Sequence, residues 1–172
     1  VMVMVEGCRN DIEELEKEYP NYHFYISENE IAIFSKTEIN KIEEKKGVFS
    51  TTVINFKVKN VDFYAVDVSA SFDVPREWGL EFVDLQIINN KNAIILGDFN
   101  VPFESCYLKN IKANFNHAFN EKGNGFRETW FWNIPLLSLD HIWVSKDLEI
   151  LKTEKIGTFK SDHCMIKTFV RK

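Results

Sequence analysis

The chain has 172 residues, enough for one domain with a substantial hydrophobic core. Hydrophobic residues make up 45% of the sequence and charged residues 27%, which is typical of soluble globular domains and disfavours disordered or fibrous chains. The net charge is −5 and the lysines are scattered, so we expect no strong basic patch for long duplex DNA. The apolar runs are too short to span a bilayer, and the three cysteines are expected to be free thiols because they show neither disulfide nor zinc spacing.

The N-terminal half is predicted to contain several short strands and two helices. Asn10 is an expected N-cap for an acidic helix that ends before Pro20, and Pro75 suits the first turn of a second helix reaching about Asn89. The last two strands of this half should form a hairpin around Asn60. The predicted strands are Val1–Val5, buried on both faces, then His23–Ser27, Glu30–Ser35, about Val48–Lys57, and Asp62–Ser69.

The C-terminal half continues the alternation of strands and helices. Ala93–Leu96 has the pattern of a buried strand, and a short helix is expected around Ser105–Ile111, with a loop at residues 123–125. The final predicted strands are Leu139–Ser145, Glu149–Thr153 and Cys164–Val170. Because helices fall between strands and no linker or repeat is visible, we predict one domain over residues 1–172 with a layered α/β fold and mixed sheets.

Three acidic segments follow or precede apolar strands: Gly97–Asn100, Leu139–His141 and Ser161–His163. Residues two apart in an extended chain share a face, so Asp98 and Asn100 should point the same way. A carboxylate can bind a hard cation or accept a proton from water, and a carboxamide can contact a phosphoryl oxygen without adding charge. Each segment alone is typical of an ordinary turn, but their joint placement at strand ends indicates a site.

In order and spelling, these three segments resemble the endonuclease/exonuclease/phosphatase superfamily, which includes nucleases, deadenylases, sphingomyelinases and inositol polyphosphate phosphatases. The strand-like segments 1–6 and 31–35 agree with the same resemblance, which covers nearly the whole chain. It implies a four-layered α/β sandwich with two packed mixed sheets flanked by helices. Cys106-Tyr107 and Thr129-Trp130 are most similar to a bacterial branch whose domain often follows N-terminal membrane helices, so a membrane tether outside the given sequence is compatible with it.

The resemblance implies hydrolysis of a phosphate ester by water, with Mg²⁺ or Mn²⁺ as cofactor. Glu6, Asp98 and Asp162 would contribute to the metal site, and Asp98 would also orient or deprotonate the attacking water. Asn100 would hold that water or a phosphate oxygen. His163, oriented and charged by Asp140, would stabilise charge on the phosphoryl oxygens. The residues placed in catalysis are therefore Asp98, Asn100, Asp140, Asp162 and His163.

The substrate side of the expected site combines Asn100, His163, Asp67, Trp130 and Arg127. Asp67 stands where the family has a phosphate-contacting His or Tyr, and a carboxylate there repels phosphate unless it is protonated or binds a second cation. The rings of residues 130–132 are candidates for stacking on a base or touching lipid, or for packing beneath their loop. We expect a monomer acting on a nucleic-acid end, a nucleotide or a phosphorylated small molecule.

Some alternatives stay open at this level. A degenerate, non-catalytic domain that binds a phospholigand or a partner is favoured by Asp67 and by the lack, before Val1, of the family's first strand and helix and of the Asn in which that strand ends. The given sequence is therefore expected to lack that strand and helix, and the compartment stays open. His141 should point to the face opposite Asp140, and His117 is expected to be an ordinary surface or loop residue.

Overall fold

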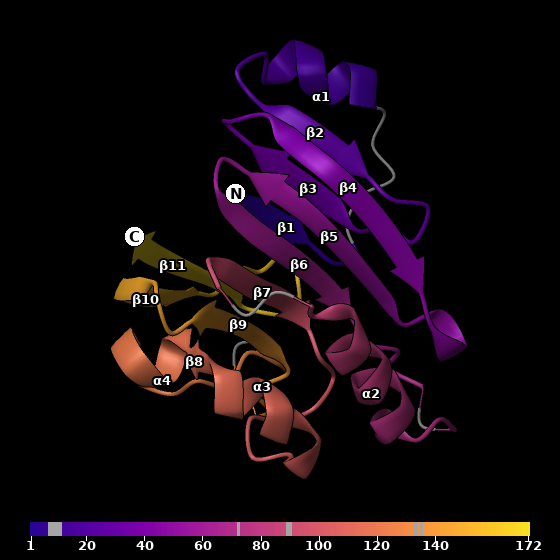
Figure 1. The fold of residues 1–172 in the computed structure, drawn as a ribbon, viewed down its shortest axis with the longest axis vertical. Coiled ribbons are helices and arrows are strands. Elements are labelled where there is room, and N and C mark those ends of the chain that lie inside the picture. Colours follow the sequence, from indigo (N-terminus) through magenta and orange to yellow (C-terminus); the bar gives the residue numbers. More distant parts are fainter. Residues whose placement is uncertain (7–11, 72, 89–90, 133, 135) are drawn as a thin grey trace.

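A six-stranded mixed sheet forms the centre of the protein (Figure 1), seen in a computed structural model that describes residues 1–6, 12–71, 73–88, 91–132, 134 and 136–172. Strands β6 and β7 pair in parallel and the other neighbours pair antiparallel. The spatial order is β4 (Ile39–Lys46), β5 (Thr52–Val58), β6 (Val61–Asp67), β7 (Ala93–Asp98), β9 (Asp140–Ser145) and β8 (Phe115–His117).

Helices cover one face of this sheet. Helix α2 (Arg76–Gln86) is the crossover that the parallel β6–β7 pair requires, and the 3₁₀ turn η2 (Cys106–Leu108) and helix α3 (Lys109–Asn114) follow β7. Their buried side chains pack on the sheet in one cluster that includes Leu80, Val83, Leu108, Ile111, Val53, Val66, Ile95 and Trp143. None of the described helices is long and apolar enough to cross a membrane.

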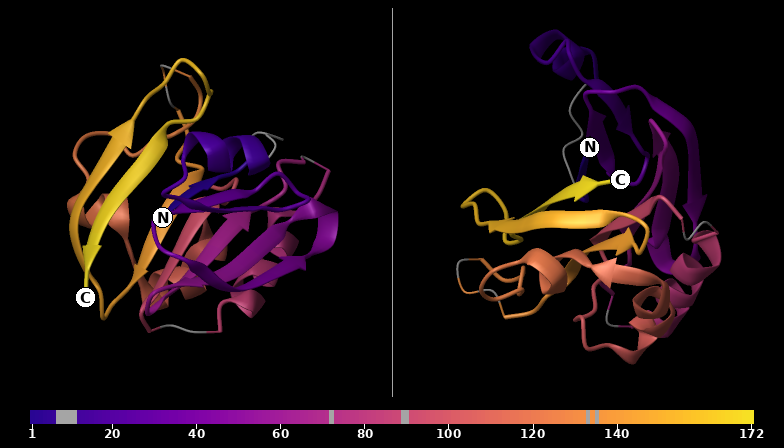
Figure 2. Two further views of the ribbon diagram at one scale, coloured as in Figure 1. Left: turned by 90° about the horizontal axis from the view of Figure 1, so that it is seen from above. Right: turned by 60° about the vertical axis from the view of Figure 1, so that its left-hand side comes forward.

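Two separate pieces cover the opposite face, as the two views of Figure 2 show. A three-stranded sheet of β1 (Met2–Met4), β3 (Ala32–Ser35) and β2 (His23–Ile26) packs on β5 and β6, and the hairpin β10 (Glu149–Ile156)–β11 (Met165–Arg171) packs on β7 and β9. Helix α1 (Ile12–Glu18) lies outside the three-stranded sheet. The expected α/β sandwich with packed sheets flanked by helices is confirmed.

Several predicted boundaries are wrong for identifiable reasons. Strand β1 is not buried on both faces, because Met2 and Met4 are about two-fifths exposed (41% and 40%) and only Val3 faces the core. The strand expected from Val48 begins at Thr52, because Val48–Ser50 forms the 3₁₀ turn η1. Helix α2 ends at Gln86; Asn89, its predicted end, and Asn10, the predicted N-cap, lie outside the described residues.

Three elements were not predicted at all. Strand β4 is an edge strand with the sequence INKIEEKK, whose charged side chains hide the alternation that marks a half-buried strand. Strand β8 and helix α4 (Ala118–Lys122) have only three and five residues, too few for a periodic pattern. They matter because they bring His117 into the interior.

The prediction for His117 is wrong, whereas His141 points away from Asp140 as expected. Both imidazoles are buried, at 5% and 1% exposure. His141 Nε2 lies 2.9 Å from the Val101 carbonyl and must donate to it, so its Nδ1 accepts from His117 Nε2 at 3.1 Å. His117 Nδ1 in turn accepts the Asn120 amide at 3.3 Å. This chain of hydrogen bonds needs both rings to be neutral.

Acid should therefore destabilise the protein through these two histidines. Burial lowers the pKa of His117 from 6.5 to about 3 and that of His141 to about 4. A depressed pKa gives stability that is complete above pH 6.5 and declines as the pH falls toward 4, because the unfolded chain takes up protons that the folded chain refuses. Between pH 7.5 and 5.5 the pair should remove on the order of 3 kcal/mol from the free energy of unfolding.

Urea unfolding at the two pH values checks this, with the double variant His117→Gln/His141→Gln as reference. Other groups titrate equally in both proteins, so the difference between the two pH dependences isolates the histidine pair. Equal pH dependence in the two proteins would show that the buried rings take up protons without penalty.

Candidate active site

Three carboxylates lie in one row across neighbouring strands of the central sheet. Asp67 at the end of β6 is paired with Asp98 at the end of β7, and Asp98 is paired with Asp140 at the start of β9. Paired residues point to the same side of a sheet, and alternation along β7 puts Asp98 on the side of Ile94 and Leu96, which face the second layer of strands. The row therefore opens toward that second layer.

Gly97 makes this arrangement of β6 and β7 possible. Its φ is +142°, and a Cβ built on it would lie 1.9 Å from the carbonyl oxygen of Val66 on the neighbouring strand. Only a residue without a side chain fits between the two backbones. The glycine before Asp98 is thus required by the close approach of the strand that carries Asp67.

Asn100 holds the Asp98 carboxylate from both sides. Its backbone N–H donates to one Asp98 oxygen at 2.7 Å, and its side-chain amide donates to the other at 3.1 Å. The second amide hydrogen donates to the Val68 carbonyl at 2.7 Å, and the residue has the left-handed φ of 50° that asparagine tolerates. Both amide hydrogens of Asn100 are therefore used inside the protein, which leaves its side-chain carbonyl oxygen without a hydrogen-bond partner among the described residues.

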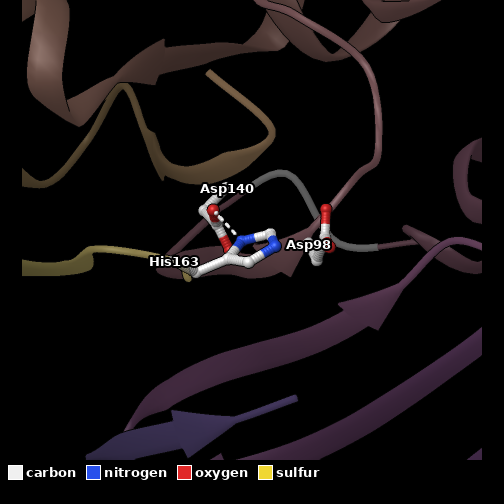
Figure 3. A group of neighbouring side chains, drawn as sticks. All are labelled: Asp98, Asp140 and His163. Atoms are coloured by element: carbon white, nitrogen blue, oxygen red, sulfur yellow. Dashed lines mark hydrogen bonds and ion pairs between the residues drawn. The ribbon is translucent and has the colours of Figure 1, made fainter. Parts of the chain in front are cut away.

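Asp140 and His163 form a hydrogen-bonded pair in which Asp140 Oδ2 and His163 Nδ1 are 2.8 Å apart (Figure 3). His163 comes from the loop before β11, and its ring lies between the carboxylates of Asp140 and Asp98. Thr129 fixes the start of β9, because its buried hydroxyl accepts the backbone amides of Leu139 and Asp140 at 3.2 Å each. In the sequence, Thr129 stands out only as part of a family resemblance, and nothing near it in the chain predicts this positioning role.

The pKa values of both His163 and Asp98 are raised from their ordinary values. Burial alone would lower the pKa of His163, but the hydrogen bond and charge of Asp140, with the charges of Asp98 and Asp162, raise it to about 9. Burial and the charge of Asp140 raise the pKa of Asp98 to about 8, against the Asn100 amide and His163, which lower it. Near neutral pH the imidazole is therefore cationic, whereas the Asp98 carboxyl group is mostly protonated and becomes a proton acceptor when a nearby positive charge lowers its pKa.

Asp67 and Glu6 add further negative charge at the β6 end of the row. Burial and, to a smaller extent, the charge of Glu6 together raise the pKa of Asp67 to about 6. Glu6 follows β1 in the second layer, is exposed and has a left-handed φ of 51°. Both predicted residues thus lie at the same end of the sheet as Asp98, beside each other rather than within the tight cluster of Asp98, Asp140 and His163.

Asp162 and Trp130 contact each other at the edge of the site. Trp130 Nε1 donates to Asp162 Oδ2 at 3.0 Å, and the Asp162 carbonyl accepts the Trp132 amide at 2.8 Å. Trp130 also bridges in antiparallel fashion to His163. These bonds tie the loop before β9 to the loop before β11, so Asp162 is engaged in holding His163 in place.

Arg127 lies apart from the row of carboxylates. Its guanidinium pairs with Glu104 and with Asn120 and lies over the Phe103 ring, 4.6 Å from its centroid. The Arg127 guanidinium thus makes its contacts beside η2 and α4 and does not point toward Asp98 or His163. The sequence could not show this, because the partners are distant in the chain.

The carboxylates of the row, rather than the cationic imidazole of His163, carry donor atoms that suit a hard divalent cation. Within the described residues, one group of three potential ligands has all its donor atoms within 4.8 Å of one another: Asp98, Asp140 and His163. Carboxylate oxygens are the donors that Mg²⁺ and Mn²⁺ prefer. A cation here would also offset the repulsion that raises the Asp98 pKa. Glu6 and Asp67 are the neighbouring carboxylates that would complete its surroundings.

Comparison with known proteins identifies the fold family. The model of the Endonuclease/Exonuclease/phosphatase family matches residues 1–163. A 3′ phosphatase, NExo, from Neisseria, bound to product DNA hairpin, superimposes with a TM-score of 0.74 at 17% identity, covering 95% of this chain and 84% of that one.

Two further solved structures show the same fold. A mannosyl-6-phosphatase of Bacteroides thetaiotaomicron gives a TM-score of 0.70 at 17% identity, with 93% of this chain and 80% of that one covered. The human Nocturnin catalytic domain gives 0.68 at 16% identity, with 97% and 79% covered. A comparison with curated protein sequences finds no match. With the family match extending over almost the whole chain, this protein belongs to the endonuclease/exonuclease/phosphatase family.

Proposed function

We propose that this protein hydrolyses phosphate esters with water in a reaction that depends on Mg²⁺ or Mn²⁺. The observation that carries the proposal is the cluster of Asp98, Asp140 and His163, in which a cationic imidazole and a carboxylate of raised pKa face the same space. A phosphate ester is anionic and repels a nucleophile, so its hydrolysis needs positive charge and a proton acceptor in one place. The cluster supplies both.

Each side chain has a separate task in the proposed reaction. His163 donates from Nε2 to a phosphoryl oxygen, because Asp140 occupies Nδ1 and keeps the ring charged. Asp98, held by Asn100, accepts the proton of the attacking water. A bound divalent cation supplies Lewis acidity that offsets the charge of the ester. The side-chain carbonyl oxygen of Asn100 is available to orient the water.

Relatives with named activities support phosphomonoesters as the first substrates to test. The Neisseria structure is described as a 3′ phosphatase with product DNA, and the Bacteroides structure as a mannosyl-6-phosphatase. Phosphodiesters should be tested as well, because positive charge and a proton acceptor assist the hydrolysis of both classes of ester.

The test measures hydrolysis of p-nitrophenyl phosphate and bis-p-nitrophenyl phosphate with Mg²⁺ or Mn²⁺ and after chelation by EDTA. Chelation should abolish the activity, and Asp98→Asn should lower kcat about a hundredfold, the typical contribution of a general base. Glu77→Gln, which removes an exposed carboxylate of α2, is the matched control and should match the wild type. Hydrolysis that survives both EDTA and Asp98→Asn would refute the mechanism.

A non-catalytic binding domain of the same fold is the second candidate. Asp67 favours it, because this half-buried carboxylate beside Asp98 repels the phosphate that the site would bind. Calorimetry with Mg²⁺ and with inorganic phosphate separates the candidates. The absence of turnover of any ester with either metal, whether or not phosphate binds, would support the non-catalytic domain, whereas metal-dependent turnover would exclude it.

A further inference from the structure

An apolar rim borders the candidate active site. Large hydrophobic side chains in the loop before β9 and in the loop before β11 are exposed to solvent. They are Phe131 (45%), Trp132 (45%), Ile134 (75%), Leu136 (68%), Leu137 (41%) and Phe159 (84%). Single exposed hydrophobic residues are ordinary on proteins, but these six lie on two loops that are hydrogen-bonded to each other, which makes them a candidate interaction surface.

The rim is continuous with the catalytic residues through the backbone. The Trp132 amide donates to the Asp162 carbonyl, and Trp130 bridges to both Leu137 and His163. Phe159 stands four residues before His163 in the second loop. A partner that binds this rim would therefore lie next to the Asp140–His163 pair.

The composition of the rim favours lipid over nucleic acid as its occupant. Residues 129–137, with the sequence TWFWNIPLL, contain no charged residue in a chain that is 27% charged. A nucleic-acid strand needs several cations along its backbone, but Arg127 is paired with Glu104 and the loop that carries Phe159 adds a single lysine, Lys160. Aliphatic side chains such as Ile134 and Leu136 do not stack on bases, whereas they insert readily into the acyl region of a bilayer. Trp132 beside them has the amphipathic ring that prefers a membrane interface.

We propose that the apolar rim docks this protein on a lipid surface, so that the site receives phosphate esters carried by lipid headgroups. This inference rests on the proposed function for its chemistry, but not for its binding. The rim inserts into the interface, and His163 faces the headgroup layer. Binding by a few inserted side chains is expected to be weak and reversible.

The test is co-sedimentation of the full chain with vesicles of phosphatidylcholine, alone or mixed with phosphatidylglycerol, in EDTA so that no turnover is needed. The wild type should bind, and brominated acyl chains should quench tryptophan fluorescence, an effect that Trp132→Phe should reduce. The double variant Leu136→Ser/Phe159→Ser should bind at least about tenfold more weakly. Both positions are strongly exposed, so the fold should tolerate the change.

The matched control is Leu85→Ser/Ile88→Ser, which removes equally exposed side chains (76% and 81%) from the region of α2 and should change vesicle binding less than twofold. Asp98→Asn should bind vesicles like the wild type. No vesicle binding by a wild type that hydrolyses soluble esters would overturn the docking surface and leave the proposed function standing. Vesicle binding without hydrolysis of any ester would refute the proposed function and leave the docking surface standing. Binding of single-stranded oligo(dT) that falls in Leu136→Ser/Phe159→Ser, without vesicle binding, would assign the rim to nucleic acid and overturn the inference.

Discussion

Replacing His163 by Ala should lower kcat for a phosphate ester about a thousandfold, the upper end of what one charged donor contributes to a developing anion. Asp140 acts through the same imidazole, since its Oδ2 is 2.8 Å from His163 Nδ1 and its charge helps to raise the His163 pKa to about 9. Asp140→Asn should therefore lower kcat by about a hundredfold. The double variant should be no slower than His163→Ala alone, because residues that act as a unit are not additive.

The pH profile separates this mechanism from simple damage to the fold. If the reaction needs a protonated imidazole, wild-type activity declines on the alkaline side as His163 loses its proton near pH 9. Without the Asp140 charge, the same decline should move to lower pH. His23→Ala, which removes an exposed histidine on β2, is the control and should alter neither kcat nor the profile. Effects of His163→Ala and Asp140→Asn that multiply in the double variant would mean that Asp140 works independently of the imidazole.

Much of the fold could be predicted because its strands are apolar and its helices are periodic. The strands that hold the site, β7 and β9, showed clear hydrophobic patterns that end at Asp98 and begin at Asp140. Strand β4 escaped prediction because its face is charged, and β8 because it is short. These failures had a physical cause: pairing and burial decide such segments, and neither leaves a local pattern.

The sequence could indicate which residues belong to the candidate site, but not the contacts that they make. The motifs place Asp98, Asp140 and His163 at strand ends, and the structure brings their donor atoms within 4.8 Å of one another. Contacts between distant residues could not be read from the chain. Examples are the pairing of Arg127 with Glu104, and the hydrogen bond from Trp130 to Asp162. Both contacts tie together segments that are far apart in the chain.

Gly97→Ala should destabilise the protein by more than about 3 kcal/mol, because the added methyl group would meet backbone that cannot move. The new Cβ would lie 1.9 Å from the Val66 carbonyl oxygen and 2.9 Å from the Val66 nitrogen, at a φ of +142° that L residues rarely adopt. Val66 is fully buried in the main core cluster, so β6 cannot move away without opening that core.

The matched change Gly157→Ala meets only Cys164 Sγ at 3.9 Å, an ordinary contact, and should cost less than about 0.5 kcal/mol. Guanidinium unfolding of the three proteins measures the difference. A Gly97→Ala protein that is within about 1 kcal/mol of the wild type would show that β6 and β7 can separate, and Asp67 and Asp98 would then not be held in one row by the backbone.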